Sequence, residues 1–243
     1  MDFSVIILII MGLCFFTTNG KKISLLIYYI FKDIIHNIKN RKNNKYNFSN
    51  FYGIHLFCGR TGGGKNMTVN YLICEIREKY KDNVYIATNF NHKKSDFKFM
   101  SLEEINDDYD KPILFVIDES NTIFNSRKYK EFDFNFLRTL THNRHKRKMI
   151  YCLTQDYNML DISFRRLCLY VYQCKTRFHR LTIFKKYLVE DYEQLINEKN
   201  VDKKRKIKPL QRISFVQTDE LRQMYDTFEM VEDLKKVLSK KED

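Results

Sequence analysis

The chain has 243 residues, 44% of them hydrophobic and 30% charged, which is enough for one compact domain with appendages. Its six cysteines include no C-x-x-C pair, which excludes the usual zinc-binding frameworks and suits a reducing compartment. A net charge of +13 favours a polyanion or an anionic membrane as partner, although a codon bias towards lysine would also produce it.

The first segment is an uncharged apolar run. Residues 3–16 and the polar residues after them approach the minimum length of a helix that crosses a bilayer. Lys21 and Lys22 follow, and such positive charges stay on the cytoplasmic side of a membrane. We therefore expect residues 1–20 to be a single-pass anchor in a host inner or plasma membrane, with a cytoplasmic domain behind it. A secretory signal peptide, for which Asp2 is unusual, and a buried core helix are the alternatives.

The next segment is apolar on one side. Its apolar residues recur at steps of three and four: Ile23, Leu26, Ile27, Ile30, Ile34 and Ile38. This pattern over residues 23–38 predicts an amphipathic helix in the headgroup region or against a partner helix. A re-entrant or second spanning helix is the alternative. Residues 39–50 are polar and basic and indicate a linker near anionic lipid, so that residues 21–50 form a membrane-proximal segment.

A glycine-rich loop comes next. Residues 53–58 are apolar, residues 59–65 read Gly-Arg-Thr-Gly-Gly-Gly-Lys, and residues 67–80 have helical character. This order predicts a P-loop, in which backbone amides and the helix N-terminus hold phosphates and Lys65 reaches the β- and γ-phosphates. We expect ATP to contact Gly59, Arg60, Thr61, Gly62, Gly63, Gly64, Lys65, Asn66 and Met67. The alternative is a glycine-rich turn with a chance lysine.

An acidic pair ends a later strand. After a strand expected at residues 84–88, residues 113–117 form an unbroken apolar run, typical of a strand buried on both faces of a parallel sheet. Asp118 and Glu119 follow it, at the edge where open α/β sheets bind ligands. We predict that Asp118 binds Mg²⁺ and that Glu119 is the general base. An exposed acidic turn is the alternative.

Asn66 occupies a position that is normally a metal ligand. A Ser or Thr hydroxyl usually follows the P-loop lysine and binds Mg²⁺. An amide oxygen can also bind a hard cation, so we expect Asn66 to be the second protein ligand of the ion.

Residues that complete a hydrolytic site follow. The expected strand 149–154 ends in Gln155, which we predict to orient the attacking water, unless it is a solvent-facing residue at the start of a loop. A helix expected at 132–148 ends in a basic cluster that contains Arg144. Arg144 is a candidate arginine finger acting on a neighbouring subunit, as are Arg165 and Arg166. A nucleic-acid contact and a solvated helix end are the other readings of the cluster.

The C-terminal part shows three further patterns. Strands at 169–177 and 181–189 predict a hairpin. A basic run at 203–208 indicates a mobile loop or tail, and residues 219–239 have helical character. We expect an α/β ATPase domain over residues 51–190, a mainly parallel sheet flanked by helices, and a basic arm with a C-terminal helix over residues 191–243.

The order of these motifs resembles the zonular occludens toxin (Zot-like) family, which includes the assembly ATPases of filamentous phages. The resemblance covers about residues 53–175, and the matching segments are Gly59 to Lys65, Ile113 to Glu119, Arg144-His145, Leu153-Thr154-Gln155 and Leu160 to Leu167. It implies a RecA/ASCE-like P-loop NTPase of the FtsK–HerA branch, an inner-membrane ATPase that helps to assemble and extrude phage. Two features depart from the family: the expected anchor precedes the ATPase domain, and Asn66 replaces the hydroxyl residue.

These observations predict a membrane-anchored ATPase, with ATP and Mg²⁺, that moves DNA or phage nucleoprotein through an envelope. We expect it to form a homo-oligomeric ring and to act with other assembly proteins. A DNA translocase for plasmid transfer or packaging is one alternative. A membrane scaffold that binds nucleotide without hydrolysing it is the other.

Overall fold

The computed structural model describes residues 18–42, 46–120, 124 and 146–225. The chain divides into two units, residues 1–50 and residues 51–243, and each is described by itself. The apolar run expected to be an anchor, at residues 3–16, lies outside the described residues, as do Arg144 and most of the helix expected at 132–148.

The first unit contains helix α2 (Thr18–Lys42), which includes the helix predicted at residues 23–38. It continues to Lys42, so the segment expected to be a linker begins later than residue 39. Its exposed apolar side chains are Ile23, Leu25, Leu26, Tyr28, Tyr29, Ile30, Phe31, Ile34, Ile35 and Ile38. In the described part of the chain, no helix combines the length and the apolar character that crossing a bilayer requires.

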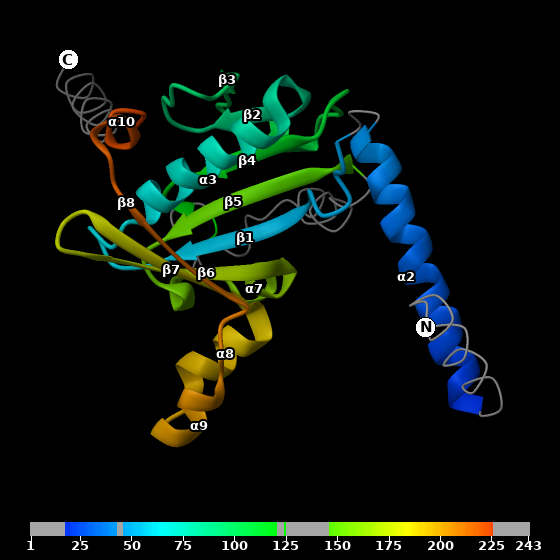
Figure 1. The fold of residues 1–243 in the computed structure, drawn as a ribbon. Coiled ribbons are helices and arrows are strands. Elements are labelled where there is room, and N and C mark those ends of the chain that lie inside the picture. Colours follow the sequence, from blue (N-terminus) through cyan, green and yellow to red (C-terminus); the bar gives the residue numbers. More distant parts are fainter. Residues whose placement is uncertain (1–17, 43–45, 121–123, 125–145, 226–243) are drawn as a thin grey trace, which may run out of the picture. The chain divides into compact units, whose positions relative to one another are not determined.

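An eight-stranded sheet forms the second unit, in the order β3-β2-β4-β5-β1-β6-β7-β8 (Figure 1). The strands are β1 (Gly53–Cys58), β2 (Tyr85–Thr88), β3 (Phe97–Lys98), β4 (Ile113–Ile117), β5 (Lys148–Thr154), β6 (Cys168–Arg177), β7 (Leu181–Leu188) and β8 (Gln211–Val216). Strands β1 to β6 pair in parallel, whereas β7 and β8 pair antiparallel. The predicted α/β fold with a mainly parallel sheet is confirmed.

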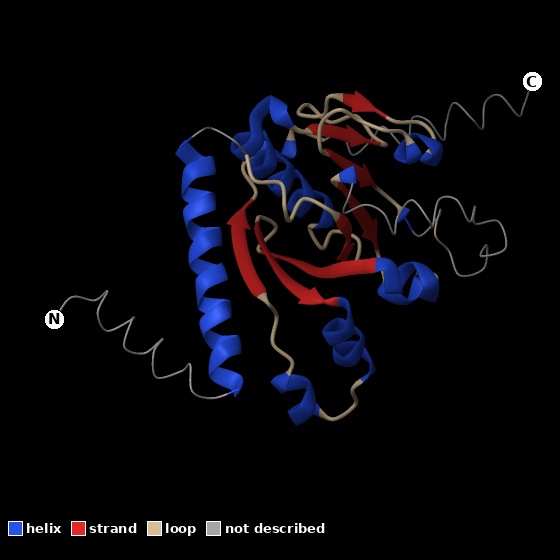
Figure 2. Cartoon of the chain, turned by 90° about the vertical axis from the view of Figure 1, so that its right-hand side faces the viewer, coloured by secondary structure: helices blue, strands red, loops and turns tan. Residues whose placement is uncertain are grey.

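Helices cover both faces of this sheet (Figure 1 and Figure 2). Helix α3 (Lys65–Tyr80) lies on one face, and α7 (Ile162–Leu167) and α8 (Val189–Asn197) lie on the other. Every residue of β1, β4 and β5 is buried, which explains why their sequences are mostly apolar and do not alternate with polar residues. The described residues of this unit also form shorter helices: η1 (Lys81–Asn83), η2 (Leu102–Asn106), η4 (Tyr157–Met159), α9 (Val201–Lys206) and α10 (Asp219–Arg222).

Lys148 is a core residue and not the end of a basic helix. It begins β5 and is 1% exposed. Its Nζ donates to the carbonyl oxygen of Ile105 at 2.6 Å and to that of Asp107. Burial, with a smaller effect of Lys146, lowers the pKa of Lys148 to about 8. The prediction that the basic helix extends to residue 148 is therefore wrong, because these carbonyl groups accept the ammonium group inside the fold.

The sheet also extends further along the chain than expected. The predicted β6–β7 hairpin is confirmed, but β8 pairs with β7 from Leu181↔Val216 to Lys186↔Gln211. The boundary expected at residue 190 thus falls inside one folded unit. The first part of the basic run 203–208 is helical in α9, where the side chain of Asn200 accepts two backbone N–H groups as the N-cap.

Candidate functional site

The loop between β1 and α3 is tightly curled. Gly62 and Gly64 adopt left-handed φ angles of 74° and 84°. The backbone N–H of Gly63 donates to the carbonyl of Arg60 at 2.8 Å, and that of Thr68 donates to Gly64 at 2.9 Å. Alternating left-handed residues bring neighbouring amides to one concave side, which is the geometry that binds anions.

This loop packs directly on the hairpin of β6 and β7. A Cβ atom on Gly64 would lie 2.3 Å from Oγ1 of Thr176 and 3.0 Å from Oγ1 of Thr182. One on Gly59 would lie 2.8 Å from the carbonyl oxygen of Cys174. Glycine at these positions therefore permits a contact that any side chain would prevent. Gly62 has open space around it, so its backbone angle alone favours glycine there.

Lys65 folds back over the loop. Its Nζ donates to the carbonyl oxygens of Gly59 at 2.8 Å and of Arg60 at 3.3 Å. Burial lowers the pKa of Lys65, while the nearby carboxyl of Asp118 opposes this shift. The ammonium group is thus held beside the loop, where it can contact a bound phosphate without a change in the backbone conformation.

Strand β5 lies between β1, which leads into the glycine-rich loop, and β4, which leads into Asp118 and Glu119. Its Thr154 aligns with Cys58 of β1, and its Cys152 aligns with Ile117 of β4. Because parallel strands end at one edge, the loop, Gln155 and the acidic pair meet there. They line one cavity of about 760 Å³ that contains Lys65, Asp118, Glu119 and Gln155.

Asp118 is 7% exposed and holds several hydrogen bonds. Its Oδ2 accepts from Nδ2 of Asn66 and from the hydroxyl of Tyr225, each at 2.9 Å, and its Oδ1 accepts from the backbone N–H of Glu119 at 2.8 Å. Its own N–H donates to Oδ1 of Asn89 at 2.9 Å. The carboxylate is therefore fixed in place by the side chains of Asn66 and Tyr225 and by the backbone of Glu119.

Asn66 lies next to the acidic pair, where a second ligand of the metal ion would have to be. Its amide nitrogen, and not its oxygen, faces Asp118. That Asn66 is a ligand of Mg²⁺ stays a prediction. Glu119 is exposed, lines the same cavity and has a left-handed φ of 52°, an uncommon conformation that is concentrated at functional sites.

The predicted phosphate-binding residues divide between two cavities. Thr61, Gly62, Gly64, Lys65, Asn66 and Met67 line the first, while Gly59, Arg60, Thr61, Gly62 and Gly63 line a second one of about 910 Å³. Gln155 lines both. The second cavity carries the basic side chains Arg60, Lys175, Arg177, Lys185 and Arg212.

The two arginines of α7 differ. Arg165 lies 4.8 Å from the ring centre of Tyr157, and its Nη1 is 3.3 Å from Oδ1 of Asn158 and 3.8 Å from Oε1 of Glu193. These contacts hold the Arg165 guanidinium group against its own chain. Arg166 is exposed.

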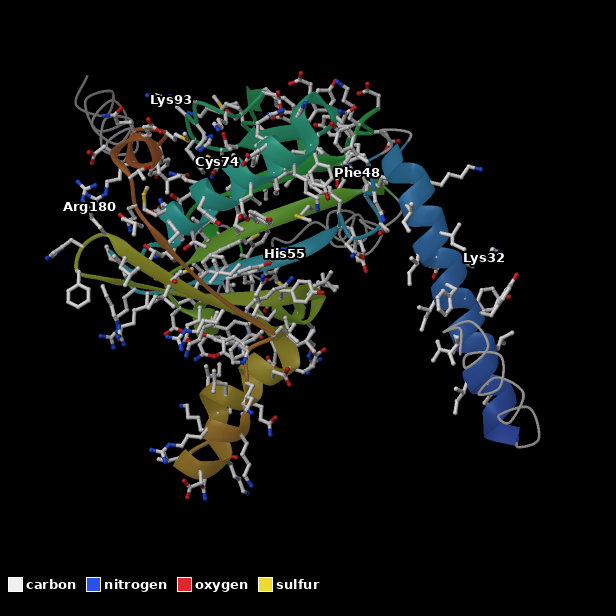
Figure 3. The ribbon with its side chains drawn as sticks, in the orientation of Figure 1. Lys32, Phe48, His55, Cys74, Lys93 and Arg180 are labelled. Carbon is white, nitrogen blue, oxygen red and sulfur yellow. The ribbon has the colours of Figure 1, made fainter. Side chains whose placement is uncertain are left out.

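The chain after β8 also reaches the site, which local sequence patterns did not indicate. We call residues 217–225 the C-terminal strap; its Gln217, Arg222 and Tyr225 line the first cavity. The Tyr225 ring meets that of Phe90 edge-on at 4.7 Å. The carbonyl of Met224 accepts from the N–H of Lys93 at 3.1 Å, and its sulfur lies 3.3 Å from that of Cys74. Figure 3 labels Cys74 and Lys93 on this side of the sheet.

Comparison with known proteins identifies the family. The model of the zonular occludens toxin (Zot) family matches residues 67–233. The N-terminal domain of zonular occludens toxin from Neisseria meningitidis has a similar fold, with a TM-score of 0.52, 16% identity, and coverage of 72% of this chain and 99% of that chain. The genome packaging NTPase B204 from Sulfolobus turreted icosahedral virus 2, in complex with ATP-gammaS, gives a TM-score of 0.41, with 16% identity and coverage of 57% and 93%. A search of curated proteins gives no match.

At 16% identity, the likeness to the Neisseria domain concerns the fold alone. The match of the family model is of a different kind, because it spans more than half of the sequence. The chain belongs to the zonular occludens toxin (Zot) family.

Proposed function

We propose that this chain is a membrane-anchored, oligomeric ATPase that moves DNA or phage nucleoprotein through an envelope. The observation that carries the proposal is a single cavity lined by Lys65, Asp118, Glu119 and Gln155. A phosphate-binding loop, two carboxylates and a polar residue between them are the parts that ATP hydrolysis needs.

Each of these residues has a chemical role in the proposal. Lys65 neutralises phosphate charge, Glu119 accepts a proton from the attacking water, and Gln155 orients that water. The Asp118 carboxylate fits a magnesium ion, because Mg²⁺ binds one or two carboxylates and completes its shell with phosphate and water oxygens. When bound, the ion would neutralise charge on the β- and γ-phosphates. Half a turn of the Asn66 amide would present its oxygen to the same place.

In an oligomer, a neighbouring subunit would supply a positive charge to the phosphate that is cleaved. Phosphoryl transfer in such motors uses an arginine from a neighbouring subunit. Arg166 suits this role better than Arg165, because Arg166 is exposed and Arg165 is held against Tyr157 and Glu193. Arg144 remains a second candidate. Other assembly proteins would complete the machine.

The basic lining of the second cavity supports the proposal that the motor moves a polyanion. Its basic side chains line the same edge of the sheet as the phosphate loop, so a nucleic acid bound there would lie next to the site of hydrolysis. The same observation favours a DNA translocase or packaging motor as the second candidate function. Binding that weakens steeply with salt would indicate direct phosphate contacts, because these contacts release counterions.

The N-terminal segment supports the membrane part of the proposal. The uncharged run at residues 3–16 is followed by lysines, and exposed apolar side chains of α2 follow these in turn. We propose a single-pass topology with the ATPase domain in the cytoplasm. Flotation of the full chain with anionic vesicles tests it, and recovery of the chain in the vesicle-free fraction would count against it.

Steady-state phosphate release by the purified full chain tests the enzymatic part. We expect Mg²⁺-dependent release of phosphate from ATP, and we expect Glu119→Gln to bind ATP as the wild type does while losing turnover. Gln155→Ala should retain binding and lower turnover less. If the wild type binds ATP with no release above that of Glu119→Gln, the chain is a nucleotide-binding scaffold and not a motor.

A further inference from the structure

Phe178 is an exposed aromatic ring at the edge of the first cavity. It lies at the end of the β6–β7 hairpin, is 86% exposed, and lines the same cavity as Lys65 and Asp118. A phenylalanine ring left in water lacks the favourable free energy that its burial would contribute. A ring in this position is therefore available to a ligand of the cavity.

The hairpin turn holds this ring outward in an unusual backbone conformation. Phe178 and His179 have φ angles of 50° and 58°. Two successive left-handed residues are normally Asn and Gly, which adopt that region most easily. A bulky aromatic residue at such a position is sterically disfavoured.

The turn is also held rigidly by the C-terminal strap. Arg222 donates to the carbonyl of His179 and to Oε1 of Gln217, while Arg180 donates to the carbonyl of Gln217 at 3.1 Å. Arg180 pairs with Asp219 of α10 at 2.8 Å. Figure 3 labels Arg180 at this end of the hairpin. A ring on a fixed turn loses little further conformational freedom when a ligand binds.

The position of the turn relative to the phosphate loop is fixed as well. Gly64 sits against Thr176 and Thr182, and the hydroxyl of Thr182 accepts from Nε2 of Gln217 at 2.8 Å. The same cavity is lined by the loop and the acids and also by Met67, Phe178 and His179, with Gln217 and Arg222 beside the turn.

We propose that Phe178 stacks on the base of the bound nucleotide. This inference rests on the nucleotide site proposed above: with the triphosphate on the loop, the nucleoside has the part of the cavity near Met67 and Phe178 available. A flat, apolar ring recognises a base by its π-face, which all bases share. Phe178 would therefore raise affinity for nucleosides and not read the hydrogen-bonding edge of the base.

Calorimetric titration of the full chain with ATP and with inorganic tripolyphosphate separates the base from the phosphates. Base stacking on an aromatic side chain contributes about 1–3 kcal/mol, so Phe178→Ala should weaken ATP binding about tenfold or more. Phe178→Tyr should stay within about twofold of the wild type. Tripolyphosphate should bind equally to all three. Met100→Ala is the matched control, because Met100 is 85% exposed and does not line the cavity.

Two results would overturn the inference while leaving the proposed function intact. In one, Phe178→Ala binds ATP like the wild type. In the other, Phe178→Ala weakens ATP and tripolyphosphate equally, which would indicate a structural role of the turn. A wild type that binds neither compound, with Lys65→Ala behaving identically, would overturn the nucleotide site itself and the inference with it.

Discussion

Replacing Gly64 by alanine tests how closely the phosphate loop packs on the β6–β7 hairpin. The new Cβ would lie 2.3 Å from Oγ1 of Thr176 and 3.0 Å from Oγ1 of Thr182, in a residue with a φ of 84°. Gly62 is the matched control, because it has a similar φ of 74° and nothing within 4 Å of an added Cβ. Both variants carry the same backbone strain, and the variant at Gly64 alone carries the clash.

The magnitudes follow from these distances. A left-handed alanine costs about 1–2 kcal/mol, so Gly62→Ala should lower the free energy of unfolding by this amount. Gly64→Ala must also push the loop off the hairpin. That movement disturbs the hydrogen bonds between Thr176 and Thr182, 3.0 Å, and between Gln217 and Thr182, 2.8 Å. At about 0.5–1.5 kcal/mol each, the total loss should be about 2–5 kcal/mol.

Urea unfolding of the two variants measures this difference, and titration with tripolyphosphate measures its effect on the loop. Gly64→Ala should bind tripolyphosphate much more weakly than Gly62→Ala. Adding Thr176→Ala to Gly64→Ala removes the nearest clashing atom and should recover part of the stability, an interaction that a double-mutant cycle isolates. Equal losses at Gly62 and Gly64, with no recovery in the double variant, would refute the packing argument.

Three further outcomes are expected. Tyr225→Phe should lower the Mg²⁺ concentration for half-maximal ATP hydrolysis about tenfold, since the metal no longer competes with the phenol for Asp118; an unchanged concentration would contradict this. In the folded chain the pKa of Lys148 is lowered to about 8, so between pH 8 and 10 the unfolded chain binds more protons at Lys148 than the folded chain does. The free energy of unfolding of the wild type should therefore rise with pH relative to that of Lys148→Met, and parallel curves would argue against a buried ammonium group. Arg166→Ala should lower turnover without changing ATP affinity, whereas Arg165→Ala should lower the melting temperature; the reverse pattern would exchange their roles.

The central parts of the candidate site were predictable because they follow strands. Lys65, Asp118 and Gln155 each come after an apolar run, and in a parallel sheet such residues gather at one edge. The same rule applies to Asn89, which follows β2 and holds the backbone N–H of Asp118, although the sequence interpretation did not use it. Most residues of the site at this edge of the sheet can therefore be predicted from where the strands end in the sequence.

The remaining parts depend on contacts between distant segments. Strand β8 is largely exposed, and polar and apolar residues alternate only from Arg212 to Phe215, so the pattern is short and the pairing with β7 is what places the strand in the sheet. Tyr225 follows β8 in the chain and lines the cavity because β8 pairs with β7, and Phe178 lines it because it lies at the hairpin turn. Lys148 looked like a surface residue because its acceptors, the carbonyls of Ile105 and Asp107, lie far away in the sequence.

A crystal structure of Glu119→Gln bound to Mg²⁺ and ATP would show directly whether the loop and the acidic pair hold the same nucleotide. We expect a triphosphate on the curled loop, with its terminal phosphate next to Lys65 and facing Asp118 and Gln155. Nucleotide bound elsewhere, or a triphosphate on the loop that turns away from the acidic pair, would contradict it.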